Sequence, residues 1–410
     1  MGFHYGILVL GYVVGFYMAW NIGANDVANS MASAVGAKAI TIRQAVFIAG
    51  ILNIAGAVFI GSHVTETIRK GIVSPAVMAD PHAALLGAMA ALLAAALWVS
   101  FATWKSLPVS TTHSIVGAMI GFGISAAGFS VINWSRLLAV VASWVISPVF
   151  ALVLSFVMFK IIVRYVTSHK TPFLRALRMS PLFAGIAIFV VVLSFLFKTP
   201  LGKTLSVSGG LAVALAVVMA ALLGMTARFL LQKFLAYDEE EGKGAEQVFR
   251  QIQIGTSCYV ALAQGANDVA NAIGPLAVIY FLVTTGSVGA KVPVPVFLLL
   301  FGGVGIAAGI GMAGYRVMDT LGHRITTLTN TRGFSVDFAA ATTVLAASKM
   351  GLPVSTTHAA VGGVLGVGLA RGMEAVDYNI VFRIMLYWIL TVPAAAITSM
   401  VLYKLLDLFL

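Results

Sequence analysis

Two acidic residues in the middle of apolar stretches are the residues of this sequence most suited to chemistry. Asp26 and Asp268 occupy the same place in a repeated segment, Gly-Ala-Asn-Asp-Val-Ala-Asn, at Gly23–Asn29 and at Gly265–Asn271. A carboxylate within a membrane-spanning helix costs roughly 2.5–3.5 kcal/mol on insertion scales, so it implies a cation, a bound proton or a polar partner. A polar cluster that only packs helices together is the alternative. Two carboxylates at equivalent positions favour a functional site.

Asparagines flank each carboxylate and could bind either charge. Asn25 and Asn29 are four positions apart, and Asp26 and Asn29 three apart, so all can lie on neighbouring parts of one helix face. Their carbonyl oxygens are hard ligands for a hard cation, and their amide N–H groups donate to an anion. Gly23 and Gly265 precede the clusters and would permit the helix to break and release backbone groups. The asparagines of the second copy are Asn267 and Asn271.

A second repeated stretch, Pro-Val-Ser-Thr-Thr-His, follows each of these segments, at Pro108–His113 and Pro353–His358. Proline suits the first turn of a helix, and the hydroxyl groups can cap it. Such a helix start offers unpaired N–H groups, hydroxyl donors and a positive dipole end, which bind an oxyanion. Hydroxyls that bond back to their own helix are the alternative. The hydroxyl residues are Ser110, Thr111, Thr112, Ser355, Thr356 and Thr357.

Four further polar residues stand close to these motifs or within apolar segments. His113 and His358 end the second stretch, and we expect them to support the site through hydrogen bonds. Gln264 stands where the first copy has Ile22, which suggests one extra polar contact on the second side. Asp337, near the start of its apolar segment, is either a coupling residue or an interfacial one.

The two motifs recur in the same order at nearly constant offsets, 242 positions for the first and 245 for the second, so the chain is internally duplicated. It has 60% hydrophobic and 10% charged residues and a mean hydropathy of +1.00, which indicates a polytopic membrane protein. The net charge of +11 comes from basic residues at span ends and does not predict nucleic-acid binding. The single cysteine, Cys258, excludes an intramolecular disulfide. No nucleotide-binding or hydrolase motif is present, so we expect neither an enzyme nor an ATP-driven pump.

The pattern predicts an all-α fold with about twelve membrane segments. The fourth segment of each repeat is short and begins with the hydroxyl stretch, so it is a candidate for a broken or re-entrant helix. The predicted segments are 5–35, 44–61, 84–104, 107–127, 134–163, 181–198, 206–231, 248–281, 294–315, 335–350, 353–370 and 379–406.

Basic residues orient these segments. The cluster between Arg164 and Arg178 and the loop around Lys233 should be cytoplasmic, which places both termini outside and divides the 25 basic residues into 17 inside and 8 outside. An odd number of segments in each repeat then gives the two copies opposite orientations, as is common in secondary transporters. The predicted units are a first repeat (1–163), two intervening spans (164–235), an acidic cytoplasmic linker (236–247) and a second repeat (248–410).

With these motifs in hand, the sequence resembles the inorganic phosphate transporter (PiT) family, whose signature is the duplicated Gly-Ala-Asn-Asp-Val-Ala-Asn in two inverted halves. The resemblance covers nearly the whole chain apart from the two middle spans. It implies secondary transport of inorganic phosphate, coupled to sodium in many members and to protons in others. The long cytoplasmic insertion of animal members is absent, which is typical of a prokaryotic protein of the cell membrane.

We therefore predict a phosphate site shared by the two repeats, with sodium ions beside it and no other cofactor; a homodimer is compatible with the sequence. The predicted phosphate ligands are Asp26, Asn29, Ser110, Thr111, Thr112, Asp268, Asn271, Ser355, Thr356 and Thr357. The predicted sodium ligands are Asn25, Asp26, Asn267, Asp268, Gln264, Ser110 and Ser355. A proton-coupled symporter, a sulfate permease and an anion channel are the alternatives.

Overall fold

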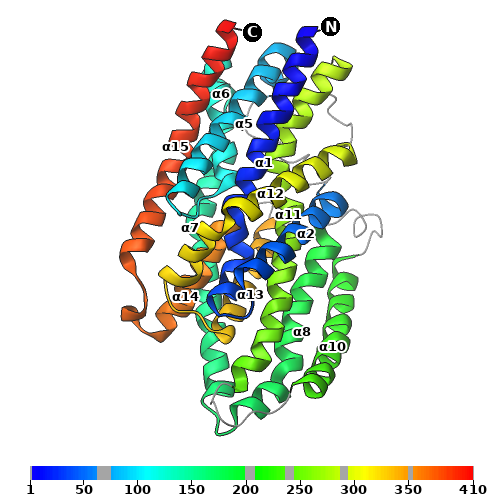
Figure 1. The fold of residues 1–410 in the computed structure, drawn as a ribbon, viewed down its shortest axis with the longest axis vertical. Helices are drawn as coiled ribbons and strands as arrows, with labels where there is room; N and C mark the ends of the chain where they lie inside the picture. Colours follow the sequence, from blue (N-terminus) through cyan, green and yellow to red (C-terminus); the bar gives the residue numbers. More distant parts are fainter. Residues whose placement is uncertain are drawn as a thin grey trace.

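The computed structural model is a bundle of helices, and it describes residues 2–61, 75–198, 208–235, 244–286, 294–349 and 354–409 (Figure 1). These residues contain no β-strand. The α-helices are α1 (Gly2–Gly36), α2 (Ile42–Ile60), α4 (Pro75–Ala79), α5 (Pro81–Trp104), α6 (Thr111–Ala127), α7 (Trp134–Ile162), α8 (Pro172–Lys198), α10 (Gly209–Phe234), α11 (Gly244–Thr285), α12 (Val296–Asp319), α13 (Asn330–Lys349), α14 (Thr356–Arg371) and α15 (Tyr378–Phe409). The short turns are η1 (Phe129–Val131), η2 (Val163–Thr167), η3 (Thr320–Arg324) and η4 (Met373–Ala375).

Each of the twelve predicted segments coincides with one α-helix, and α4 is an additional short one. Nine of the described helices are long and apolar enough to cross a membrane. The other three are α6, α13 and α14, of which α6 has 17 residues and α14 has 16. The prediction of an all-α, multi-pass membrane protein is confirmed, and the fourth helix of each repeat is short, as expected.

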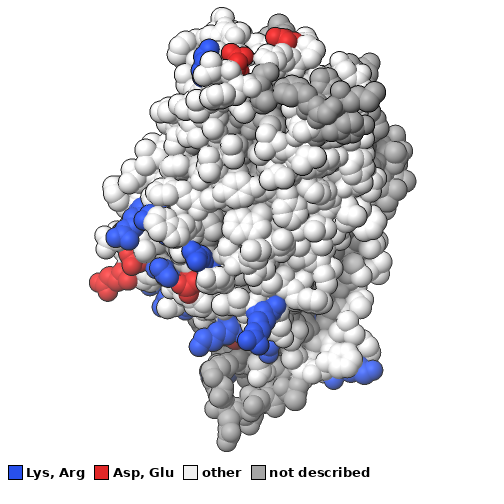
Figure 2. All heavy atoms as spheres, turned by 45° about the horizontal axis from the view of Figure 1, so that its top comes forward, with Lys and Arg blue, Asp and Glu red and all other residues white. Residues whose placement is uncertain are grey.

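Both chain ends lie at one end of the bundle, and the turn between α7 and α8 lies at the other (Figure 1). On the face shown in Figure 2, most of the visible Lys and Arg lie over the half away from the chain ends. The orientation of this basic half toward the cytoplasm stays a prediction.

The motif glycines lie where helices cross closely. α1 crosses α12, and α11 crosses α2. A Cβ atom on Gly23 would lie 1.8 Å from the carbonyl oxygen of Ile306, and one on Gly265 would lie 2.3 Å from that of Asn53. The prediction that these glycines break the helices is wrong, because α1 and α11 run unbroken through them. Glycine is needed here for close approach of two backbones.

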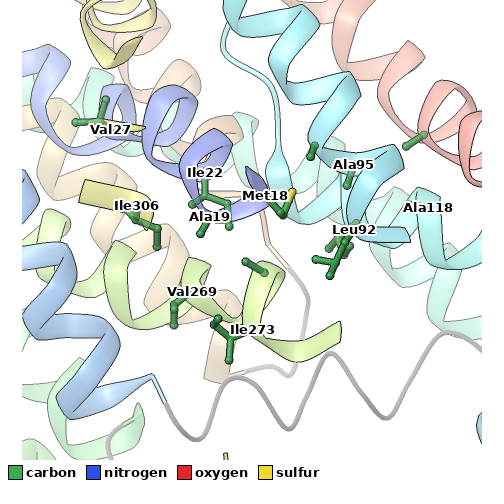
Figure 3. Close-up of a cluster of buried hydrophobic side chains, with 14 of the residues drawn as sticks. Met18, Ala19, Ile22, Val27, Leu92, Ala95, Ala118, Val269, Ile273 and Ile306 are labelled. Carbon is green, nitrogen blue, oxygen red and sulfur yellow. The ribbon is translucent and has the colours of Figure 1, made fainter. Parts of the chain in front are cut away.

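The core beside the motifs is built from small and aliphatic side chains of α1, α5, α6, α11 and α12 (Figure 3). Met18 and Ala19 of α1, Leu92 of α5, Val269 of α11 and Ile306 of α12 are fully buried there. This packing fixes α1 and α11, which contain the two carboxylates.

The two middle helices form an appendage: α10 packs against α8, and α8 packs against α11. Most of the predicted acidic linker, residues 236–243, lies outside the described residues, as does Pro353. The described end of the linker starts α11. There Glu246 accepts hydrogen bonds from the backbone N–H and the hydroxyl of Thr331, at 2.9 and 2.7 Å.

Candidate phosphate and cation site

The starts of α6 and α14 lie beside each other in the centre of the bundle. The Ser110 hydroxyl caps α6 by accepting from the His113 N–H at 3.1 Å, and Ser355 caps α14 by accepting from the His358 N–H at 3.2 Å. The two imidazole rings meet edge to face, with centroids 4.8 Å apart. The positive ends of two helix dipoles therefore converge on one place.

Pro108 does not lie in the first turn of a helix, so that prediction is wrong. α6 begins at Thr111, and Pro108 belongs to the segment that leads into it. The Trp388 indole N–H donates to the Pro108 carbonyl at 3.1 Å and so ties this segment to α15.

Asn25 holds the same segment against α1. Its amide N–H group donates to the Thr103 hydroxyl at 2.9 Å and to the Leu107 carbonyl at 3.1 Å. Its oxygen accepts from the Val109 N–H at 3.0 Å. The side chain that the sequence places among the sodium ligands thus contacts the entry to α6.

Asp26 of α1 contacts two other helices, α6 and α14. It is 1% exposed, and Thr111 of α6 donates to its Oδ2 at 2.5 Å. Its Oδ1 accepts from Thr357 of α14 at 3.2 Å and from Asn29 at 3.1 Å. One carboxylate of the first copy therefore contacts the helix starts of both copies.

Two asparagines bond crosswise between the copies. Asn29 donates to two hydroxyls at the start of α14, and Asn271 donates to two at the start of α6. The distances are 3.2 Å from Asn29 to Thr356 and 2.9 Å to Thr357, and 3.3 Å from Asn271 to Thr111 and 3.1 Å to Thr112. Each copy thus supplies the asparagine for the hydroxyls of the other.

The second carboxylate belongs to the same centre. Asp268 is 1% exposed, and its Oδ1 accepts from the Asn267 amide at 2.9 Å. The charges of Asp26 and Asp268 lie near enough to interact. Two negative charges within one buried centre favour a cation between or beside them.

A cavity of about 130 Å³ adjoins this centre and is lined in part by Asn29, Gln264, Asn267 and Thr356. Gln264 is 2% exposed, and among the described residues neither atom of its amide has a hydrogen-bond partner; the Asn29 oxygen has none there either. Buried polar groups are normally paired, so these oxygens are fitted to a cation and the amide N–H group to an anion. The predicted residue Gln264 therefore reaches the centre.

Two tryptophans that sequence reasoning missed support the histidines. Trp388 stacks on His358 with centroids 3.7 Å apart, and Trp144 lies 5.1 Å from His113. Their positions differ by 244, which is nearly the offset of the second motif. That spacing was the signal available in the sequence.

Asp337 forms a separate buried cluster. It is 2% exposed, and it accepts from Ser33 of α1 at 2.6 Å and from Ser257 and Thr256 of α11 at 2.6 and 3.2 Å. The carboxylate is enclosed by α1, α11 and α13, and the two sequence interpretations, a coupling residue or an interfacial one, stay predictions.

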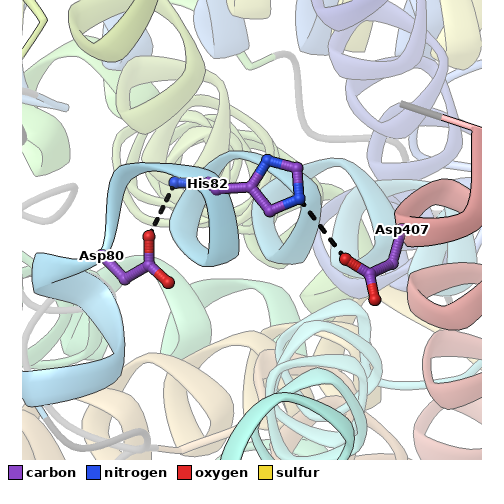
Figure 4. Close-up of polar contacts among 3 residues, drawn as sticks. All are labelled: Asp80, His82 and Asp407. Atoms are coloured by element: carbon purple, nitrogen blue, oxygen red, sulfur yellow. Dashed lines mark hydrogen bonds and ion pairs between the residues drawn. The ribbon is translucent and has the colours of Figure 1, made fainter.

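Two further acidic residues, Asp80 and Asp407, contact His82 near the C-terminal end of α15 (Figure 4). His82 Nε2 is 3.3 Å from Asp407 Oδ1, and the His82 N–H donates to Asp80 at 3.0 Å. The two side chains of the ion pair are 56% and 45% exposed, so the contact contributes little to stability.

Comparison with known proteins identifies the family of the chain. A family model described as the phosphate transporter family matches residues 22–399. A protein of Pyrococcus abyssi, provisionally named a phosphate permease, is 50% identical over 399 residues, covering 97% of this chain and 98% of the relative. The chloroplastic inorganic phosphate transporter 2-1 of Arabidopsis thaliana is 41% identical over 414 residues, covering 94% of this chain and 70% of that protein.

A solved structure described as the sodium-dependent phosphate transporter is similar over the whole chain. The TM-score is 0.90 and the sequence identity 46%, with 99% of this chain and 100% of that chain covered. The family and this structure are transporters and not enzymes. The chain belongs to the phosphate transporter family.

Proposed function

We propose that this protein is a secondary active transporter that imports inorganic phosphate together with sodium ions. The observation that supports this most is the meeting of two buried carboxylates, Asp26 and Asp268, with the positive starts of α6 and α14. A phosphate bound at the helix starts would add negative charge beside the carboxylates. Cations would offset both, which is a physical reason for coupling.

Phosphate would be held by hydroxyls and by backbone N–H groups of the two helix starts. Ser110 and Ser355 keep these starts in place through their capping bonds. Asn29 and Asn271 would turn their amide N–H groups from the opposite hydroxyls toward the anion. The proposed ligands are Thr111, Thr112, Thr356, Thr357, Asn29 and Asn271, with the helix starts that follow Ser110 and Ser355.

Sodium would bind to Asp26 and Asp268 with the amide oxygens of Gln264 and Asn267. These are hard oxygen ligands, and the unpartnered Gln264 amide lies in the wall of the adjoining cavity. Asn25 would act through the segment before α6, which its side chain already holds.

The carboxylates also give a way to prefer phosphate over sulfate. Near neutral pH phosphate retains a proton that it can donate to Asp26 or Asp268, whereas sulfate has none. An unmet buried acceptor costs about 1–3 kcal/mol, so sulfate would bind more weakly.

Alternating access would come from rocking one repeat (1–163) against the other (248–410), with the centre between them. The reciprocal crossings of α1 with α12 and of α11 with α2 support two inverted copies. The basic end of the bundle would face the cytoplasm of the cell, with both termini on the outside.

The test is uptake of labelled phosphate into proteoliposomes that contain the purified protein. Inward sodium and inward proton gradients are applied in turn, with excess sulfate as competitor. Sodium-driven accumulation that sulfate does not block is the expected result.

Accumulation driven by protons alone would keep phosphate as the substrate and make the two aspartates proton carriers. Sulfate accumulation would overturn the substrate. Phosphate flux that never exceeds its own concentration gradient would indicate a channel and overturn the proposal.

A further inference from the structure

A larger cavity, of about 610 Å³, lies between the appendage and the second repeat. Each of α8, α10 and α11 lines it with residues spaced three and four apart, which form one stripe on each helix. Representative lining residues are Ala184, Ile188, Leu230, Phe234, Gly255 and Tyr259. The cavity is therefore enclosed by three helix faces rather than by loops.

The wall of this cavity is mainly apolar, and its rim faces the surface that the membrane covers. Leu230 and Phe234 of the spanning helix α10 are 46% and 72% exposed. Gln251, Thr256 and Tyr259 are the polar residues of the described lining. A phosphate dianion would lose its hydration there without a charged partner, whereas burying hydrocarbon is favourable.

A basic side chain stands at one end of the cavity. Lys233 of α10 has its ammonium group 5.7 Å from the centroid of the Phe234 ring, which lines the cavity. Arg250 of α11 instead donates to the Ala39 carbonyl at 2.9 Å. α11 has 42 residues and so spans about 63 Å, twice the roughly 30 Å hydrocarbon core, and its first turns lie beyond that core. Lys233 stands in the last turn of the spanning helix α10, so it lies at the depth of lipid headgroups, where it attracts anionic lipids.

We propose that this cavity binds an acyl chain of an anionic phospholipid. The headgroup lies against Lys233, and the chain runs inward between α10 and α11 to Tyr259. Tyr259 and Val191 also line the small cavity beside the phosphate and cation site, so the end of the chain packs on a wall shared with that site.

The test uses the purified full chain in phosphatidylcholine vesicles that contain a tracer phospholipid with a photoactivatable group near the end of its acyl chain. Crosslinked peptides are identified by mass spectrometry. Phosphatidylglycerol tracer should label residues of α8 and α11 around the cavity more strongly than phosphatidylcholine tracer. The Gly255→Leu variant should lose this labelling by about fourfold or more for each methylene displaced.

Gly255 is suitable for the test because an added Cβ atom would meet no described atom within 4 Å, and the position lines the cavity that the larger side chain would fill. Gly311→Leu on α12 is the matched control, since that glycine also has open space, and its labelling should equal that of the parent. Labelling that Gly255→Leu leaves unchanged, or equal labelling by the two tracers, would overturn the proposal. Labelling that added inorganic phosphate removes would show a phosphate route instead. None of these results depends on transport activity.

Discussion

Two buried clusters of carboxylate and hydroxyl groups lie along α1 and α11, and only one of them is duplicated. Asp26 and its hydroxyl partners have counterparts at offsets of 242 and 245 positions. At the same offsets, Asp337 corresponds to Leu92, Ser33 to Pro275 and Ser257 to Gly15. The duplicated centre contains polar groups from both copies. The positions that correspond to the Asp337 cluster in the other copy hold residues without polar side chains.

The difference indicates which parts of the molecule serve both sides of the membrane. A substrate site used from both faces benefits from equivalent ligands in each copy. The Asp337 cluster connects α1, α11 and α13 and has no equivalent at the repeat-related positions. Ser33 follows Asp26 by seven residues, so the clusters are about 10 Å apart along α1 and can be perturbed separately.

The strongest test of the duplicated centre is to neutralise each of its carboxylates. Asp26→Asn and Asp268→Asn should each reduce phosphate uptake to background, because each loses a charge that would balance the cation. Hydrogen bonds to charged groups contribute about 1.5–3 kcal/mol each, and several are lost together. Initial uptake rates in proteoliposomes measure the effect.

Asp80→Asn is the control for this pair, since Asp80 is an exposed helix cap and asparagine caps equally well. Its uptake should match that of the parent. Normal uptake by either Asp26→Asn or Asp268→Asn would contradict a site to which both copies contribute a carboxylate.

Substitution of Asn29 and of Asn271 should weaken phosphate uptake equally, and less than substitution of the carboxylates. Asn29→Ala and Asn271→Ala each remove one amide that bonds to two threonine hydroxyls of the other copy. Each should raise the phosphate concentration for half-maximal uptake by about tenfold, because one or two neutral hydrogen bonds are lost. The exposed Asn379→Ala should leave it unchanged. A large effect of one variant with none of the other would show that the copies differ in function.

The duplication explains how much of this molecule could be predicted from sequence. The α-helices follow from apolar segments long enough to span a membrane, and the polar residues of the centre follow from two motifs that recur in the same order. The straight course of α1 through Gly23 was not foreseen, because the reason lies in Ile306, far away in the chain. Likewise the position of Pro108 before α6 depends on Trp388 and Asn25, and no local pattern specifies such contacts.

Asp337→Asn should affect transport less than either carboxylate of the centre. The substitution weakens three hydroxyl contacts that join α1, α11 and α13, at a cost of about 1–3 kcal/mol in the free energy of unfolding. We expect a lower thermal midpoint and a reduced maximal uptake rate, with half-saturation by phosphate unchanged. Asp319→Asn, at an exposed ion pair with Arg324, should change neither quantity. A shift in phosphate half-saturation as large as that of Asn29→Ala would mean that the two clusters form one site.

The smallest effect should come from the one polar residue of the centre that lacks a polar counterpart. Gln264→Ile gives the second copy the residue that the first has at Ile22, and it removes an amide oxygen from the cavity beside the centre. The sodium concentration for half-maximal uptake should rise about three- to tenfold, the value of one neutral contact of about 0.5–1.5 kcal/mol. Gln253→Ile is the matched control. It is another buried glutamine of α11 whose amide has no hydrogen-bond partner in the described part of the chain, but it lies outside the lining of that cavity. If both variants shift the sodium dependence equally, burial on α11 and not contact with the ion explains the effect, and the asymmetry at Gln264 has no role in coupling.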